Sequence, residues 1–159
     1  MEKDRVQEYS TRVVQANRTE LLVIVYEILQ EELKQALVEY EREDITAFDT
    51  ALKNAQKFLN ELMGTLDYQY ALSFQLLSIY KFINKVIIRD RLRVQTEQLE
   101  GCVQLVEKLR EAYVQISSED KEGPVMKNVQ QVYAGLTYGR SALSEVSVDE
   151  SQGHRGLYA

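Results

Sequence analysis

The sequence is poor in the residues that interrupt helices and in those that carry most catalytic chemistry. Its 159 residues include one proline, seven glycines, one cysteine, one histidine and no tryptophan. With so few helix breakers, long stretches of the chain permit helix, and alternating strand patterns bounded by turn residues are hard to find. We therefore predict an all-α fold.

The scarcity of cysteine and histidine also limits the chemistry. Cys102 has no second cysteine with which to form an internal disulfide, and it fits a reducing compartment. His154 is too far along the chain from Cys102 for a zinc site, and it cannot supply the inward-facing Glu-x-x-His pairs of a di-iron bundle. No glycine-rich phosphate-binding string occurs. We predict no catalytic residue, no metal and no cofactor, so the protein is not expected to be an enzyme.

Charge and hydropathy exclude two further classes. The chain carries 19 basic and 25 acidic residues, a net charge of −6, which argues against a partner such as nucleic acid. Its longest apolar run, residues 21–26, is far shorter than the ~20 residues of a membrane span. The N-terminus has charges of both signs and no apolar core of a signal peptide. We expect a cytoplasmic protein that does not insert into membranes.

Hydrophobic spacing predicts a division into five parts. Four helices are expected over about 18–40, from 45 to near 66, from just after Asp67, and over about 94–117. Short polar links between such helices favour an antiparallel up-down bundle. The parts are a mobile N-terminal strip or short helix (1–16), the four-helix bundle (17–117), a linker (118–124), an additional amphipathic C-terminal helix (125–145) and a disordered tail (146–159).

The first bundle helix has more apolar surface than one packing partner needs. Asn17 is a predicted N-cap, and Glu20 three residues later completes a capping box. The apolar run that follows covers more than one helical face. Two interpretations remain open, a central helix buried on all sides and a helix that lines a partner groove, and periodicity alone favours the first. The helix after Asp67 also has apolar residues to spare, with a predicted stripe of Tyr70, Phe74, Leu77, Tyr80, Ile83 and Ile87 broadened by Leu72, Leu76, Ile79, Phe82 and Val86.

A row of basic residues recurs every four positions on the same helix: Lys81, Lys85, Arg89 and Arg93. One interpretation is an anion site, such as that of an all-α enzyme acting on a dicarboxylate. The other is a solvated face paired with the acids of the next helix, Glu97, Glu100, Glu107 and Glu111. We favour the second, because a dicarboxylate site gathers basic groups from several helices and this row comes from one.

An ordered series of residues runs through the predicted bundle, from a tyrosine in the N-terminal strip, through an Ala-Asn cap and a Val-Tyr pair, to a closing Leu-Arg-Glu-Ala-Tyr at 109–113. Before that closing segment, the members of the series are Tyr9, Ala16, Asn17, Glu20, Leu21, Val25, Tyr26, Asn54, Ala55, Leu59, Leu62, Leu66, Asp67, Leu76, Ile79 and Tyr80. Over about residues 5–117 this series resembles the flagellin export chaperone family FliS. The resemblance implies a bacterial cytoplasmic chaperone that binds the C-terminal helical segment of flagellin and prevents its polymerisation before type III flagellar secretion.

From the resemblance and the spare apolar surface together we predict a set of partner-binding residues. The two residues of this set in the N-terminal strip, Val6 and Tyr9, would cover part of the client-binding groove in the free protein or face the flagellar export gate, as the family suggests. The protein is expected to be a monomer or a weak homodimer. The predicted set is Val6, Tyr9, Leu22, Val25, Tyr26, Leu29, Leu62, Leu66, Ile79, Phe82, Ile83 and Val86.

Other functions remain as alternatives. The first is a non-catalytic helical bundle, an interaction or regulatory protein that self-associates, and the weaker one is the all-α anion-binding enzyme. The predicted C-terminal helix is also open to two interpretations, since it can compete with the client for the groove or pack permanently on the bundle. Tethering favours the first, because a short linker gives an effective concentration that reaches about mM.

Overall fold

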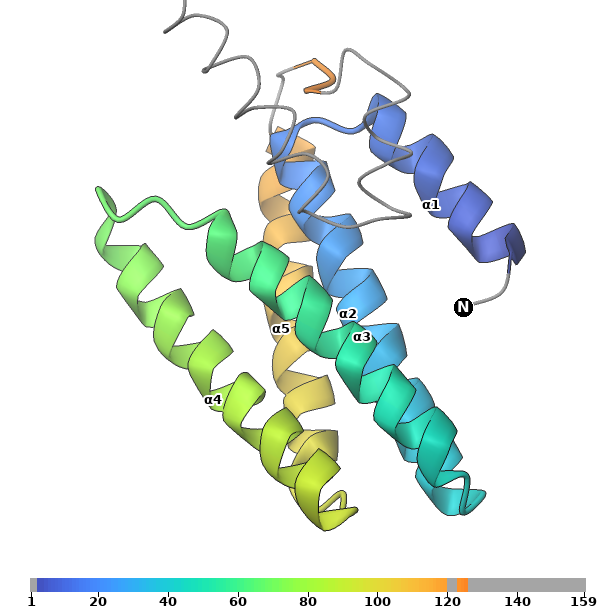
Figure 1. Cartoon of the computed structure of the whole chain (residues 1–159). Coiled ribbons are helices and arrows are strands. Elements are labelled where there is room, and N and C mark those ends of the chain that lie inside the picture. The colour runs from blue at the N-terminus through green and yellow to red at the C-terminus, as the bar shows by residue number, and fades with distance from the viewer. Residues whose placement is uncertain (1–2, 120–122, 126–159) are drawn as a thin grey trace, which may run out of the picture. The chain divides into compact units, whose positions relative to one another are not determined.

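The structure is a computed structural model that describes residues 3–119 and 123–125. This part of the chain contains helices α1 (Lys3–Gln15), α2 (Arg18–Glu41), α3 (Ile45–Gly64), α4 (Ala71–Arg93) and α5 (Leu99–Glu119), as Figure 1 shows. No strand occurs among these residues, so the predicted all-α fold is confirmed. The predicted helix over 125–145 and the predicted tail lie outside the described residues, apart from Val125.

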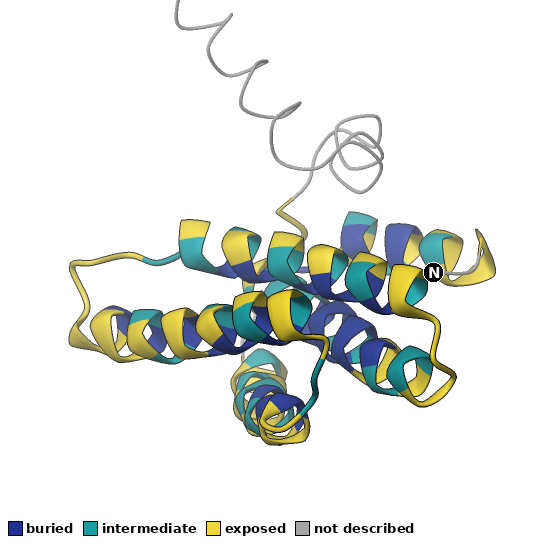
Figure 2. Cartoon of the chain, turned by 60° about the horizontal axis from the view of Figure 1, so that its bottom comes forward, coloured by how far each residue is buried: buried dark blue, intermediate teal, exposed yellow. Residues whose placement is uncertain are grey.

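The described residues fall into two compact units, one of residues 19–119 and one of residues 3–18 with 123–125. In the first unit, α2 to α5 run alternately up and down, and α4 packs against α3 and α5 (Figure 1). The buried stretches of these helices lie on the sides that face one another (Figure 2). All four helices contribute fully buried side chains to one core, among them Leu29, Leu33, Phe48, Leu52, Leu59, Leu62, Ile83, Ile87, Leu99 and Val106.

Helix α2 begins at Arg18, as the sequence predicts. Its apolar run is buried around most of the helix circumference, which fits the interpretation as a central helix. The capping box between Asn17 and Glu20 stays a prediction. The buried side chains are Val23, Ile24, Tyr26, Ile28 and Leu29, and the half-buried ones are Leu21, Leu22 and Val25.

Helix α3 has the most regular stripe, and its start is the one that the sequence defines best. Asp44 is its N-cap, and the Asp44 carboxylate accepts a hydrogen bond from the Ala47 N–H at 2.9 Å. Aspartate is among the residues that favour this cap position. The apolar stripe of α3 is buried at Phe48, Leu52, Ala55, Leu59 and Leu62, whereas Ile45 at the first turn is 45% exposed.

Near its start, helix α4 packs a different face against the core from the one that the sequence predicts. Tyr70 precedes the helix as its N-cap residue, and Phe74 is 57% exposed. The predicted stripe is therefore wrong at these positions. Because α4 is apolar around most of its circumference, the spacing of its apolar residues does not single out one buried face. The observed buried row is Leu76, Tyr80, Ile83, Val86, Ile87 and Asp90.

The turn between α4 and α5 also differs from the expectation, since α5 begins at Leu99 and not near Val94. Val94 has a φ of 50° and ends α4 in the left-handed conformation. The N–H groups of Val94 and Gln95 both donate to the carbonyl of Asp90. Glycine usually takes this position after a helix, so a valine there gives no sequence signal for the turn.

In the second unit the N-terminal strip is helical, one of the two forms expected for it. Tyr9, Ser10 and Val13 are its buried residues. The Ser10 hydroxyl donates to the Val6 carbonyl at 2.6 Å, a bond to the preceding turn of α1. Past the end of α1, the Val125 N–H donates to the Ala16 carbonyl at 3.2 Å. The start of the C-terminal extension thus lies beside the end of α1.

Candidate partner-binding surface

Several of the predicted partner-binding residues lie inside the bundle. Tyr26, Leu29, Leu62, Ile83 and Val86 are each at most 2% exposed. In this structure other side chains cover them, so a partner meets them only if the helices move. Their direct contact with a client stays a prediction, and their observed role is to form the core.

The other predicted residues are more accessible. Leu22, Val25, Leu66 and Ile79 are half-buried and pack against the core from its margin. Phe82 is 48% exposed. In the N-terminal unit, Val6 is half-buried and Tyr9 is 6% exposed.

Three tyrosines form a polar cluster in the core. The hydroxyl groups of Tyr26 and Tyr80 hydrogen-bond to each other, and the rings of Tyr26 and Tyr113 stack with centroids 5.4 Å apart. Burial raises the pKa of Tyr26 far above its usual range and the pKa of Tyr80 to about 12, and it also raises the pKa of Tyr113. All three phenols are therefore neutral near pH 7 and serve as hydrogen-bonding groups within the bundle.

Polar contacts show which flank of α4 faces α3. The Gln56 amide donates to the Asn84 side-chain oxygen at 2.8 Å, and Arg91 donates to the Asp49 carboxylate at 2.8 Å. Asn84 and Arg91 share one side of α4. By helical spacing, Ile79 and Phe82 lie on the opposite flank, which therefore faces α5.

Helix α5 presents a matching apolar flank. Glu107 hydrogen-bonds to Gln30 of α2 and to Arg110 on its own helix, so this side of α5 faces α2. Helical spacing places Leu105, Leu109 and Ile116 on the other flank, towards α4.

Together the two flanks form a strip near the end of the bundle where α4 starts and α5 ends. In Figure 1 the ribbons of α4 and α5 approach each other at the loop that joins them and diverge towards this end. Three members of the strip are 48–57% exposed: Leu72, Phe82 and Ile116. We call this surface the α4/α5 apolar strip, and it consists of Leu72, Ile79, Phe82, Leu105, Leu109 and Ile116.

Around the start of α4 there is a second group of exposed apolar side chains. Tyr68 and Phe74 pack against each other with ring centroids 5.3 Å apart, yet both are at least half exposed. Tyr70 is 66% exposed. Tyr68 thus packs against another exposed ring.

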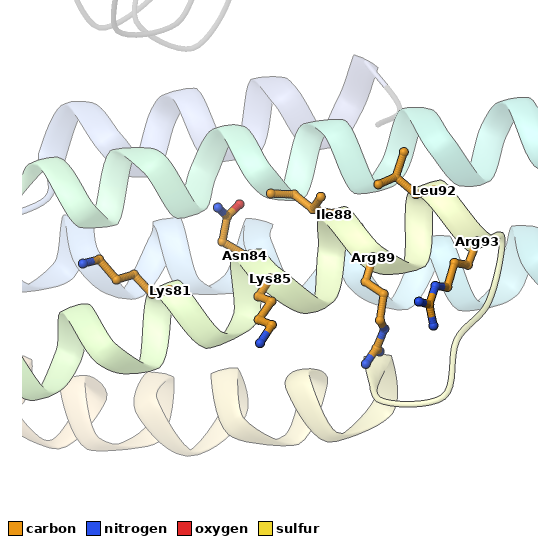
Figure 3. A pocket seen from close by; sticks show the side chains of 7 residues that line it. All are labelled: Lys81, Asn84, Lys85, Ile88, Arg89, Leu92 and Arg93. Carbon is orange, nitrogen blue, oxygen red and sulfur yellow. The ribbon is translucent and has the colours of Figure 1, made fainter.

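The basic row lies on the outer side of α4, where a shallow depression of about 400 Å³ is found. Figure 3 shows the seven side chains that line it, all from α4: Lys81, Asn84, Lys85, Ile88, Arg89, Leu92 and Arg93.

The expected pairing of this row with acids of α5 is wrong within the described residues. Arg89 donates to the Asp90 carboxylate at 2.7 Å and to the Gln98 side chain at 3.0 Å. No ion pair joins Lys81, Lys85 or Arg93 to a carboxylate in the part of the chain that the structure describes. Glu107 instead pairs with Arg110 on its own helix, which lowers the pKa of its carboxyl to about 2.

Neither a metal site nor a reactive thiol is found in residues 3–119. These residues contain no cluster of three histidine, cysteine or acidic side chains that could hold a metal ion. Cys102 is fully buried, and its burial raises the pKa of the thiol to about 11. A protonated, inaccessible thiol is a poor nucleophile.

Helix α4 is long and apolar enough, by length and composition, to cross a membrane. Its most apolar 18-residue window has a mean hydropathy of 1.3, and 33% of that window is buried. A core helix of a soluble bundle meets the same criterion, and α4 contributes Tyr80, Ile83 and Ile87 to the core of this one. The composition of α4 and its low burial together show that this helix exposes much apolar surface.

An all-α bundle that exposes apolar strips beside its core has the architecture of a protein-binding module. A family model described as "Flagellar protein FliS" matches residues 1–122. The chain therefore belongs to the FliS family, whose general role is that of flagellar export chaperones. The match confirms the resemblance found over residues 5–117 and includes the helix α1. No curated protein matches the chain.

Proposed function

We propose that the protein is a cytoplasmic chaperone that binds the C-terminal helical segment of flagellin and prevents its polymerisation before type III secretion. The observation that carries this proposal is the family match over residues 1–122. The exposed apolar surface of α4 and α5 supports it, because a chaperone for an amphipathic segment must offer apolar surface that its own fold leaves free.

The α4/α5 apolar strip is the proposed place of client binding. A disordered client that folds into an amphipathic helix can lay its apolar side along Ile79, Phe82 and Leu109. Full burial of a large apolar side chain contributes ~1.5–3 kcal/mol, and ordering of the client offsets part of this. Leu22, Val25 and Leu66, half-buried at the same end of the bundle, would extend the contact.

The buried members of the predicted set have an indirect role in this proposal. Tyr26, Leu29, Leu62, Ile83 and Val86 would shape the floor beneath the client. In the N-terminal helix, Val6 and Tyr9 are proposed to contact the client or the export gate, and Tyr9 must become accessible to do so.

The experiment is calorimetric titration of the full chain with flagellin and with flagellin that lacks its C-terminal segment. We expect binding only with the segment present. Phe82→Asp should weaken binding at least tenfold, because it places a charge on the strip. Leu92→Asp is the matched control, an exposed residue on another side of α4, and should change the affinity less than twofold. Equal binding of the truncated flagellin would refute the proposal.

A second candidate, self-association, is favoured by the exposed rings of Tyr68, Tyr70 and Phe74. Sedimentation velocity of the full chain distinguishes self-association from client binding. It is run between 1 and 100 µM, since weak homodimers have dissociation constants of about this range. A stable dimer that does not bind flagellin would favour self-association, and a monomer that binds flagellin would favour the chaperone.

A further inference from the structure

The depression on α4 combines a basic and an apolar edge. In Figure 3, Ile88 and Leu92 point to one side of the helix and Lys85, Arg89 and Arg93 to the other. Leu92 is 80% exposed and Ile88 is 41% exposed. We call the surface of Lys81, Lys85, Ile88, Leu92 and Arg93 the basic face.

The stability of the fold does not account for this face. Cations four residues apart on a helix repel each other, by ~0.2–0.5 kcal/mol per pair. Arg89, in the same row but outside the face, is compensated by its bonds to the buried carboxylate of Asp90, whereas no ion pair joins the cations of the face to a carboxylate within the described residues. A leucine exposed as fully as Leu92 adds no core packing either. Arg93 lies in the last turn of α4, where a cation favours the helix dipole, whereas the two lysines and Leu92 give the bundle no stabilising contact among the described residues.

We propose that the basic face docks an acidic amphipathic helix of a partner protein. From Lys81 to Arg93 the face extends 12 residues, about 18 Å at 1.5 Å per residue, which matches about three turns of a docked helix. Acidic side chains four residues apart on the partner would meet the basic edge. Apolar side chains beside them would cover Ile88 and Leu92, as in helix recognition by anchors at i, i+3 and i+4.

Charge and shape favour an acidic helix over nucleic acid, an anionic membrane or a small dianion as the ligand of the basic face. The whole chain has a net charge of −6, which opposes binding to nucleic acid or to an anionic membrane. A small dianion needs cations that converge from several elements, whereas these cations project from one exposed helix. A narrow acidic helix can contact the face without meeting the acidic remainder of the surface.

The basic face shares no residue with the α4/α5 apolar strip. Helical spacing centres the face on the outer side of α4, about a fifth of a turn from Phe82 and more than a third of a turn from Ile79. The proposal therefore goes beyond client binding, because the acidic helix would contact residues that the strip does not include.

The test begins with selection of random 16-residue peptides displayed on phage against the full chain. Selected peptides should carry acidic residues four apart with apolar residues beside them. Their affinity, measured by fluorescence anisotropy, should fall at least tenfold for Lys81→Glu/Lys85→Glu and for Leu92→Asp. The matched control is Lys34→Glu/Lys108→Glu, which changes the net charge equally on α2 and α5, and it should change the affinity less than threefold. Circular dichroism and thermal melting verify that each variant is folded.

Several results would overturn the proposal. One is selected peptides that lack the acidic spacing or bind the Lys81→Glu/Lys85→Glu variant as well as the unchanged chain. Another is that anionic vesicles of phosphatidylglycerol bind the chain through these lysines and displace the peptide, which would assign the face to a membrane. A dimer in sedimentation velocity that Lys81→Glu/Lys85→Glu converts to monomer would assign it to a second copy. Displacement of the peptide by flagellin would assign it to the client.

Discussion

The hydroxyl groups of Tyr26 and Tyr80 hydrogen-bond to each other across the centre of the bundle and so connect α2 with α4. Tyr26 is 0% exposed and Tyr80 is 2% exposed. A buried hydroxyl without a partner is unfavourable, so each of these two tyrosines satisfies the other. Tyr113 of α5 also bonds to Tyr26, and the cluster therefore joins three of the four bundle helices.

Removal of both hydroxyls should destabilise the bundle by less than the sum of the two single removals. Tyr80→Phe should lower the free energy of unfolding by about 1–2 kcal/mol, because it leaves the Tyr26 hydroxyl with one partner fewer. The Tyr26→Phe/Tyr80→Phe double variant should be less destabilised than the sum of the two single variants. Urea unfolding measures all three. Tyr68→Phe, at an exposed site, is the control and should have little effect, and additive effects of the two buried changes would contradict the expected coupling.

The buried tyrosine hydroxyls and the buried Cys102 thiol should make the bundle less stable at alkaline pH. Folding raises the pKa of Tyr80 from 10 to about 12 and that of Cys102 from 9 to about 11, and it raises the pKa of Tyr26 further. The folded state thus holds these protons more tightly than the unfolded chain does. The contribution of Cys102 and Tyr80 to stability is complete below about pH 9 and is lost as the pH rises through about 11 and 12, whereas that of Tyr26 is lost only at higher pH. Urea midpoints between pH 7 and 12 should show this loss.

The tyrosine contribution can be separated from that of the thiol. In the Tyr26→Phe/Tyr80→Phe variant the loss of stability above pH 10 should be smaller, whereas the part between pH 9 and 11 that belongs to Cys102 should remain. An unchanged profile in the double variant would show that other groups cause the alkaline loss.

Local signals explain which parts of this structure could be predicted. The cap at Asp44 is a short-range hydrogen bond between residues three apart, and α2 starts at the residue that follows the predicted cap Asn17. The buried row of α4 could not be predicted fully, because Phe74 and Leu76 are both apolar and only the tertiary packing decides that Leu76 is covered. The same ambiguity affects the candidate site, since spacing gives Phe82 and Ile83 equal weight although one is exposed and the other is in the core.

Val94 should be a site at which glycine stabilises the protein. Its φ of 50° is unfavourable for a β-branched residue, and at 36% exposure its side chain is outside the core. Val94→Gly should raise the free energy of unfolding by up to about 1 kcal/mol, measured by urea unfolding. Val114→Gly, at a similarly exposed site inside α5, is the control and should destabilise by about 1 kcal/mol because its backbone is helical. A loss of stability in Val94→Gly would mean that packing of the side chain outweighs the strain.

Asp90 should be the polar residue whose loss most weakens the turn between α4 and α5. Its side chain is 0% exposed, and its Oδ1 accepts hydrogen bonds from Arg89 at 2.7 Å and from Gln95 at 3.2 Å. Its Oδ2 is buried and has no hydrogen-bond partner among the described residues. Asp90→Ala should lower the free energy of unfolding by about 2–4 kcal/mol, because Arg89 and Gln95 both lose their acceptor. Asp90→Asn retains an acceptor oxygen and replaces the unpartnered charged oxygen by an uncharged amide, so it should be less destabilising than Asp90→Ala in urea unfolding. Equal losses in the two variants would show that the charge of Asp90, and not its hydrogen-bond geometry, holds the turn.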